Sequence, residues 1–182
     1  MSNNYTMSAL KVNLWAIPLM IAQVIIFSLS FYIYLGKDYW LAGLRSPLFY
    51  LQYFLPLLFI AGFLHELLHA GGFYYFGKVK RSDLKLGIIW KYLTPYAHCK
   101  VAVSVRAYRI ALLLPYMILG IIPVILSFLF RFVWLNVFGL VFCLVAGGDL
   151  LVFWLIRKVP ASELLKDHPS LCGCESVDIA KN

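Results

Sequence analysis

The segment FLHELLHAGG, residues 63–72, places two histidines and a glutamate in an otherwise apolar stretch. His65 and His69 are four residues apart, so on a helix their side chains lie on one face with Cβ atoms about 5–6 Å apart, which lets both imidazoles bind one metal ion. Glu66 follows the first histidine and can reach a metal-bound water without becoming a ligand. His-Glu-x-x-His is the spacing of a zinc site with two ligands and a general base. We therefore predict His65 and His69 as zinc ligands and Glu66 as the catalytic base.

A catalytic zinc ion usually has three protein ligands and one position open to water. In one extended form of the motif the third ligand follows ten residues after the first, where this chain has Tyr75. Asp149 is the better candidate. We expect the helix of Asp149 to end at residue 156 and that of His69 to end at residue 76, so each residue lies seven positions before its helix end. At about 1.5 Å per residue, both lie about 10 Å from the same membrane boundary. We predict Asp149 as the third ligand, and we expect Gly147 and Gly148 to let its helix approach that of His69 closely.

Several alternatives stay open for these residues. The two histidines and Glu66 can hydrogen-bond between helices without binding a metal. Asp149 can be a structural hydrogen-bond partner or a proton-relay carboxylate. His98, and after it His168, are the next candidates for a third ligand. A transporter is disfavoured, because it needs polar groups that reach both membrane faces and these groups all lie in the inner half of their predicted helices.

The elements that carry these residues are too apolar for a water-soluble domain. Of the 182 residues, 63% are hydrophobic and only 13% are charged. Four segments meet or exceed the roughly 20 apolar residues that cross a bilayer, namely 13–35, 48–76, 109–130 and 132–156. We predict an all-α integral membrane protein, a single polytopic domain over residues 1–182 with four transmembrane helices, a loop at 77–108 and a cytoplasmic tail at 157–182.

The formal net charge of +8 is concentrated between the second and third predicted helices. Residues 78–109 hold eight lysines and arginines against the single acid Asp83. Basic loops are typical of the cytoplasmic side of a membrane, and they attract anionic lipid headgroups. We therefore expect the loop and both termini to be cytoplasmic, membrane lipids to be partners, and nucleic acid not to be one. The four cysteines then lie in a reducing compartment or in the membrane, so we expect no disulfide.

The loop at 77–108 has a strand-like pattern. LKLGIIWKY, residues 84–92, is rich in β-branched and aromatic residues, and CKVAVSV, residues 99–105, alternates with a period of two. TPYAH, residues 94–98, supplies turn residues between them. We predict a short β-hairpin near the inner membrane surface, with an irregular basic loop on the headgroups as the alternative.

Together these segments resemble a known family. The quoted HELLH motif, the basic loop, RIALLLP at 109–115, GGDLL at 147–151 and DHPSLCGC at 167–174 look like the "putative zincin peptidases", a family of small bacterial membrane proteins. The resemblance extends from about residue 48 to residue 174. It implies a peptidase in the bacterial cytoplasmic membrane.

More distantly, the arrangement is similar to the site-2 proteases, intramembrane metalloproteases with His-Glu-x-x-His in one helix and a third-ligand aspartate in a later one. This similarity implies the same ligands and base as above, and a hairpin from Leu84 to Val105 that binds an unwound substrate by strand addition. Two features depart from the pattern. Two glycines precede Asp149 where site-2 proteases have one glycine after the aspartate, and Asn136 lies far upstream with no proline between.

The resulting expectation is a membrane-embedded zinc metallopeptidase of the His-Glu-x-x-His type that cleaves peptide bonds in or near the membrane. Zinc would activate a water molecule, and Glu66 would carry its proton to the leaving amine. The expected substrate is a peptide or a membrane protein. The alternative is a non-catalytic membrane protein in which the cluster serves structure or metal sensing.

Overall fold

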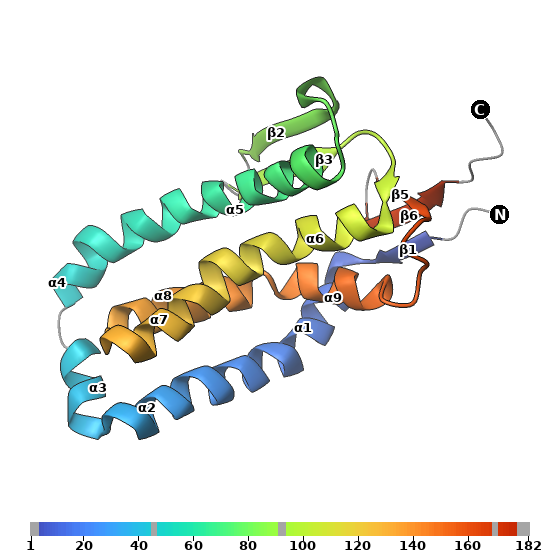
Figure 1. The fold of residues 1–182 in the computed structure, drawn as a ribbon. Helices are drawn as coiled ribbons and strands as arrows, with labels where there is room; N and C mark the ends of the chain where they lie inside the picture. The colour runs from blue at the N-terminus through green and yellow to red at the C-terminus, as the bar shows by residue number, and fades with distance from the viewer. Residues whose placement is uncertain (1–3, 45–46, 91–93, 169–170, 178–182) are drawn as a thin grey trace.

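The structure is a computed structural model that describes residues 4–44, 47–90, 94–168 and 171–177, and most of it is helical (Figure 1). The first helical stretch consists of α1 (Ala9–Gln23), the π-helical η1 (Val24–Leu29) and α2 (Ser30–Leu35). A short α3 (Lys37–Leu44) follows. The second stretch consists of α4 (Pro47–Phe49), η2 (Tyr50–Phe54) and α5 (Leu55–Phe76). The third consists of α6 (Val105–Pro115), η4 (Tyr116–Ile121) and α7 (Ile122–Phe130), and the last of α8 (Val133–Val145) and α9 (Gly147–Leu155).

Three of these stretches are long and apolar enough to cross a membrane: Leu10–Leu35, Pro47–Phe76 and Val105–Phe130. The helix predicted at 132–156 is not one continuous helix, because α8 and α9 meet at a bend of 43°. Ala146 has a ψ angle of 7° at the bend, and two glycines follow it, which have low helix propensity. The part of the chain that the structure describes therefore contains three candidate spans, or four if the bent pair crosses as one.

Close helix contacts are made by small residues. A Cβ at Gly72 would lie 2.6 Å from Cα of Ala111, so α5 and α6 approach as closely as their backbones allow. The prediction that Gly147 and Gly148 bring their helix close to α5 is wrong. These two glycines face α1, where an added Cβ would meet Ala16 at 3.8 Å and Val12 at 3.7 Å. Both are ordinary contact distances, so neither position requires glycine for space.

A β-hairpin in the loop is confirmed, but its second strand is not where the sequence pattern put it. β2 (Leu84–Ile89) pairs antiparallel with β3 (Thr94–Cys99), in a register that sets Lys85 opposite His98. TPYAH is thus strand and not turn. The alternating segment at 99–105 belongs mostly elsewhere, because Val103 in β4 (Val103–Ser104) pairs with Leu165. A substrate strand cannot add at the Val103 edge that this pairing occupies.

Strands from near both ends of the chain form a second sheet together with β4, and no sequence pattern predicted it. β1 (Asn4–Met7), β6 (Cys172–Val177), β5 (Leu164–Asp167) and β4 pair in the order β1-β6-β5-β4, with every neighbouring pair antiparallel. Gly173 has a φ of +125°, and an added Cβ there would collide with the carbonyl oxygen of Tyr5. The described part of the tail is therefore built into the fold, because β6 lies directly beside the N-terminal strand β1 (Figure 1).

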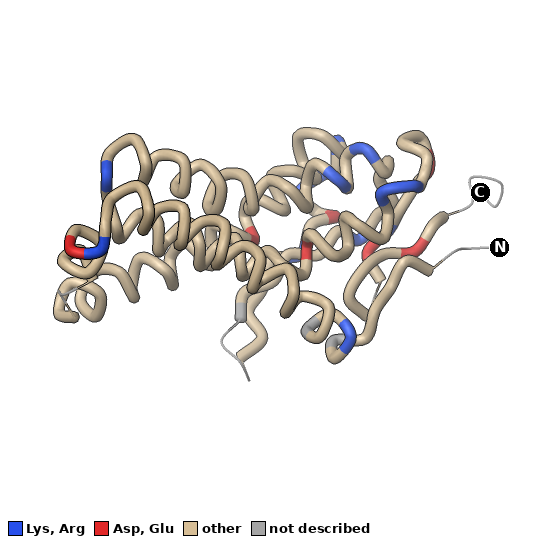
Figure 2. The backbone as a smooth tube through the Cα atoms, turned by 90° about the horizontal axis from the view of Figure 1, so that it is seen from below, with Lys and Arg blue, Asp and Glu red and all other residues tan. Residues whose placement is uncertain are grey.

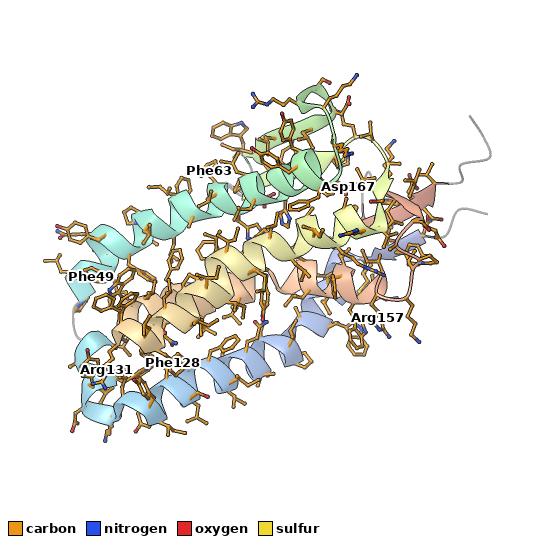
Figure 3. The ribbon with its side chains drawn as sticks, viewed as in Figure 1. Phe49, Phe63, Phe128, Arg131, Arg157 and Asp167 are labelled. Atoms are coloured by element: carbon orange, nitrogen blue, oxygen red, sulfur yellow. The ribbon has the colours of Figure 1, made fainter. Side chains whose placement is uncertain are left out.

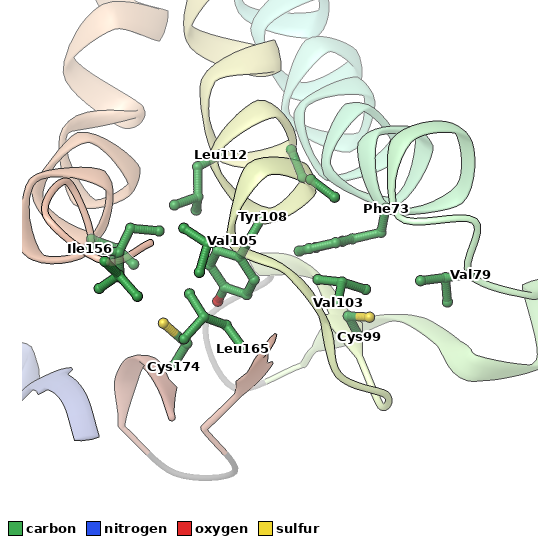
Figure 4. Close-up of a cluster of buried hydrophobic side chains, with 14 residues drawn as sticks. Phe73, Val79, Cys99, Val103, Val105, Tyr108, Leu112, Ile156, Leu165 and Cys174 are labelled. Atoms are coloured by element: carbon green, nitrogen blue, oxygen red, sulfur yellow. The ribbon is translucent and has the colours of Figure 1, made fainter. Parts of the chain in front are cut away.

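Lysines and arginines gather at the two ends of the helical body (Figure 2). Phe49 and Arg131 lie at one end, and Arg157 and Asp167 lie toward the other, which carries the sheets (Figure 3). The main buried core lies where the helices meet the sheets. There Val105 and Tyr108 of α6 pack with Ile156, Leu165 and Cys174 (Figure 4).

Candidate metal centre

Three predicted ligands come together although Asp149 is 80 residues from His69 in sequence. Nε2 of His65 and Nε2 of His69 are 3.1 Å apart. Oδ2 of Asp149 lies 3.3 Å from the first of these nitrogens and 3.4 Å from the second. Among the described residues this is the one group of three or more histidines, cysteines or acids whose ligand atoms converge in this way.

The triangle of ligand atoms has the size that zinc requires. A tetrahedral zinc ion with bonds of about 2.0–2.1 Å to nitrogen and oxygen holds its ligand atoms about 3.3 Å apart. The three edges measured here are 3.1, 3.3 and 3.4 Å. Two imidazoles and one carboxylate also form a donor set that catalytic zinc sites use, with one tetrahedral position left for water. The residues therefore fit zinc.

The second nitrogen of His69 is held by α6. Its Nδ1 lies 2.9 Å from the carbonyl oxygen of Ala111. A carbonyl oxygen can only accept, so Nδ1 carries the hydrogen and the Nε2 lone pair is directed at the triangle. This contact is possible because Gly72 lets α5 pack directly against Ala111. His65 and His69 are only 5% and 8% exposed, so they are shielded from competing water.

Glu66 lies beside the triangle and contacts the hairpin. Its Oε2 accepts a hydrogen bond of 2.7 Å from the backbone N–H of Ala97 in β3. Glu66 is partly buried and lines the same cavity as the triangle without belonging to it. Its role as catalytic base stays a prediction.

The triangle opens into a cavity of about 470 Å³. Its walls come mainly from α5, α6, α9 and the hairpin strand β3, with contributions from Asp167 of β5, His168, Leu171, and Cys172 and Gly173 of β6. Besides the three predicted ligands and Glu66, the polar lining includes His98, Tyr108, Asp167 and His168. A cavity of this size accommodates several residues of an extended peptide next to the candidate metal position.

The two alternative ligands lie in this cavity but outside the triangle. Nδ1 of His98 lies 3.3 Å from Oδ2 of Asp167. His168 lies in the turn after β5, where its Nδ1 accepts from the backbone N–H of Leu171 at 3.0 Å. Asp167, the residue that holds His98, was not singled out from the sequence. Its only signal there was its position in the DHPSLCGC segment.

All four cysteines are free thiols. Cys172 is exposed and lines the cavity, whereas Cys99 and Cys174 are buried. Burial disfavours the thiolate and raises the pKa of Cys99 to about 11 and that of Cys174 to about 12. These two thiols are therefore protonated and poor metal ligands at neutral pH.

The sequence profile of a family described as "Putative zincin peptidase" matches residues 58–164, more than half of the chain. The chain belongs to this family. The matched range contains the three candidate ligands and Glu66, and the family description suggests a metalloprotease that uses zinc. No significant match was found among curated proteins or among solved structures.

Proposed function

We propose that this member of the zincin peptidase family is a zinc metallopeptidase that cleaves peptide bonds in or near the membrane. One observation carries the proposal. The side chains of His65, His69 and Asp149 form a triangle with edges of 3.1–3.4 Å, the size of one face of a zinc tetrahedron, and Glu66 stands next to it.

Each group has a distinct part in the proposed reaction. Zinc held by His65, His69 and Asp149 would act as a Lewis acid that polarises the scissile carbonyl and lowers the pKa of a water molecule. Glu66 accepts a proton from the attacking water and delivers it to the amine that leaves. The hydrogen bond from Ala97 orients the Glu66 carboxylate through Oε2, which leaves Oε1 for this proton. No covalent intermediate with the protein is needed.

A membrane location is supported by the surface of the helices. Large apolar side chains such as Ile25, Ile33, Leu51 and Ile60 are each more than half exposed on the candidate spans. Exposed apolar surface on this scale marks contact with lipid or with a partner. We propose that all four helical stretches cross the bilayer, with the bent pair as the fourth span, and that the two sheets and both termini lie on the cytoplasmic side with the basic loop.

The test of the proposal compares cells that produce the unaltered protein with cells that produce Glu66→Gln at the same level. Glutamine keeps the size of the side chain but cannot accept the proton. N-terminal peptides of the membrane proteome, measured by mass spectrometry, should include new termini that depend on Glu66 and vanish in the variant. Identical sets of termini from the two cell types would contradict proteolysis and favour the non-catalytic, metal-sensing alternative.

A further inference from the structure

The cavity that contains the metal triangle has a second polar cluster on its hairpin side. His98 of β3, Asp167 of β5 and Tyr108 of α6 all line it. Their contacts join three elements that are far apart in sequence. The proposed reaction gives this cluster no role, since Glu66 and the three ligands account for the chemistry.

Asp167 is the centre of this cluster. Its Oδ1 accepts from the hydroxyl of Tyr108 at 2.6 Å, and its Oδ2 accepts from the backbone N–H of Cys99 at 2.8 Å. Oδ2 also lies 3.3 Å from Nδ1 of His98. Two hydrogen bonds thus fix the carboxylate, and the fixed carboxylate lies within ion-pair distance of the His98 ring.

This arrangement leaves the other nitrogen of His98 available. No partner for its Nε2 is found among the described residues, and the side chain is 33% exposed at the cavity wall. A histidine used only for packing would have its polar atoms paired or in bulk solvent. Here one nitrogen is held by a buried network while the other remains free in a cavity that also contains the proposed catalytic base.

We propose that His98 is a substrate-binding residue, and that its Nε2 hydrogen-bonds the backbone of the peptide segment next to the scissile bond. The inference rests on the proposed function. His98 directly follows Ala97, whose N–H bonds Glu66, so the strand that orients the base also presents the histidine to the substrate. Asp167 acts through His98 and is a positioning residue.

The test measures binding of two zinc-chelating probes to the purified full-length protein loaded with zinc. Acetohydroxamate has no peptide part, whereas a peptidyl hydroxamate adds a backbone to the same chelating group. His98→Ala should weaken the peptidyl hydroxamate about tenfold, the usual effect of one lost hydrogen bond in a partly desolvated site. Its zinc content and its affinity for acetohydroxamate should stay unchanged. His98→Gln, whose amide can reach the position of Nε2, should recover part of the loss.

Lys85→Ala is the matched control. Lys85 pairs directly with His98 in the hairpin, but it is exposed and lies outside the cavity lining. This variant should bind both probes as the unaltered protein does. Equal affinity of the unaltered protein and His98→Ala for the peptidyl hydroxamate would overturn this inference but leave the proposed function intact. Loss of zinc from His98→Ala would do the same. Absence of zinc from the unaltered protein would instead overturn the proposed function, and the inference with it.

Discussion

Glu66 has a structural contact and a proposed chemical role, and single substitutions can separate the two. Its carboxylate accepts from the Ala97 N–H of the hairpin at 2.7 Å. Glutamine keeps an acceptor oxygen for this N–H, whereas alanine removes it. The two variants should therefore behave alike in catalysis and differently in the hairpin.

We expect Glu66→Ala to loosen the hairpin and Glu66→Gln to leave it docked. A hydrogen bond to a charged group contributes about 1.5–3 kcal/mol, so protection of the Ala97 amide from hydrogen exchange should fall about tenfold or more in the alanine variant. Exchange of the peptide that covers 94–99, measured by mass spectrometry, checks this. Equal protection in both variants would show that Glu66 does not hold the hairpin.

The site could be predicted from the sequence only where local spacing or depth carries the information. The four-residue separation of His65 and His69 is a property of one helix, and the position of Asp149 followed from equal depth in two parallel-running helices. The contact between Asp167 and His98 joins strands of two different sheets. No periodicity in either segment encodes that contact, so it needed the three-dimensional structure.

At the scale of elements, the contact between α5 and α6 positions the metal centre. Gly72 lets the two backbones meet, and this places the carbonyl oxygen of Ala111 against His69. Arg109, two residues earlier in α6, donates from Nη2 to the carbonyl oxygens of Ile156 and Val159 and so ties α6 to the end of the helix that carries Asp149. α6 therefore connects the two helices that supply the ligands.

Two neighbouring glycines of α5 should respond in opposite ways to alanine. A Cβ at Gly72 would lie 2.6 Å from Cα of Ala111, whereas a Cβ at Gly71 meets nothing within 4 Å. Gly72→Ala should lose about 1–3 kcal/mol through overpacking and hold zinc less tightly. Gly71→Ala should be neutral or slightly stabilising, because alanine favours helix. Thermal unfolding in detergent, with and without zinc, checks both. Destabilisation of equal size in the two variants would contradict a specific contact at Gly72.

Element boundaries were predictable where composition changes sharply, as at Phe76, where the second predicted helix and α5 end together. The bend at Ala146 was not, because the apolar pattern runs through it without a break. The second hairpin strand was misplaced because Pro95 suggested a turn. Pro95 is the second residue of β3 and pairs with Ile88, and only the strand pairing reveals that position.

At the scale of the whole molecule, the sheet formed by β1, β4, β5 and β6 joins both ends of the chain to the helices. Its buried Cys174 and the nearby Cys99 have pKa values of about 12 and 11, raised from 9.0 by burial. The folded protein thus keeps these protons at pH values where the unfolded chain loses them. The contribution of this pKa difference to the free energy of unfolding is fully present below about pH 9 and is lost as the pH rises through 11 and 12.

We therefore expect the midpoint of thermal unfolding to be insensitive to these thiols from pH 7 to about 9 and to fall at higher pH. In the double variant Cys99→Ala and Cys174→Ala, this midpoint should fall less steeply with pH. The difference between the two slopes, both measured in detergent, separates the effect of the thiols from that of tyrosines and lysines. Cys172, which is exposed, should be alkylated rapidly at pH 8 while these two stay unmodified. Equal slopes of the unfolding midpoint against pH for the unaltered protein and the double variant would show that the buried thiols do not cause the loss of stability.

The central claim is that His65, His69 and Asp149 hold zinc, and metal content per chain tests it most directly. Elemental analysis of gently purified protein should find about one zinc per chain in the unaltered sequence. Asp149→Ala should lose it, because two histidines alone bind zinc weakly, and His98→Ala should keep it. No zinc in the unaltered protein, or zinc that survives Asp149→Ala, would contradict the three-ligand site.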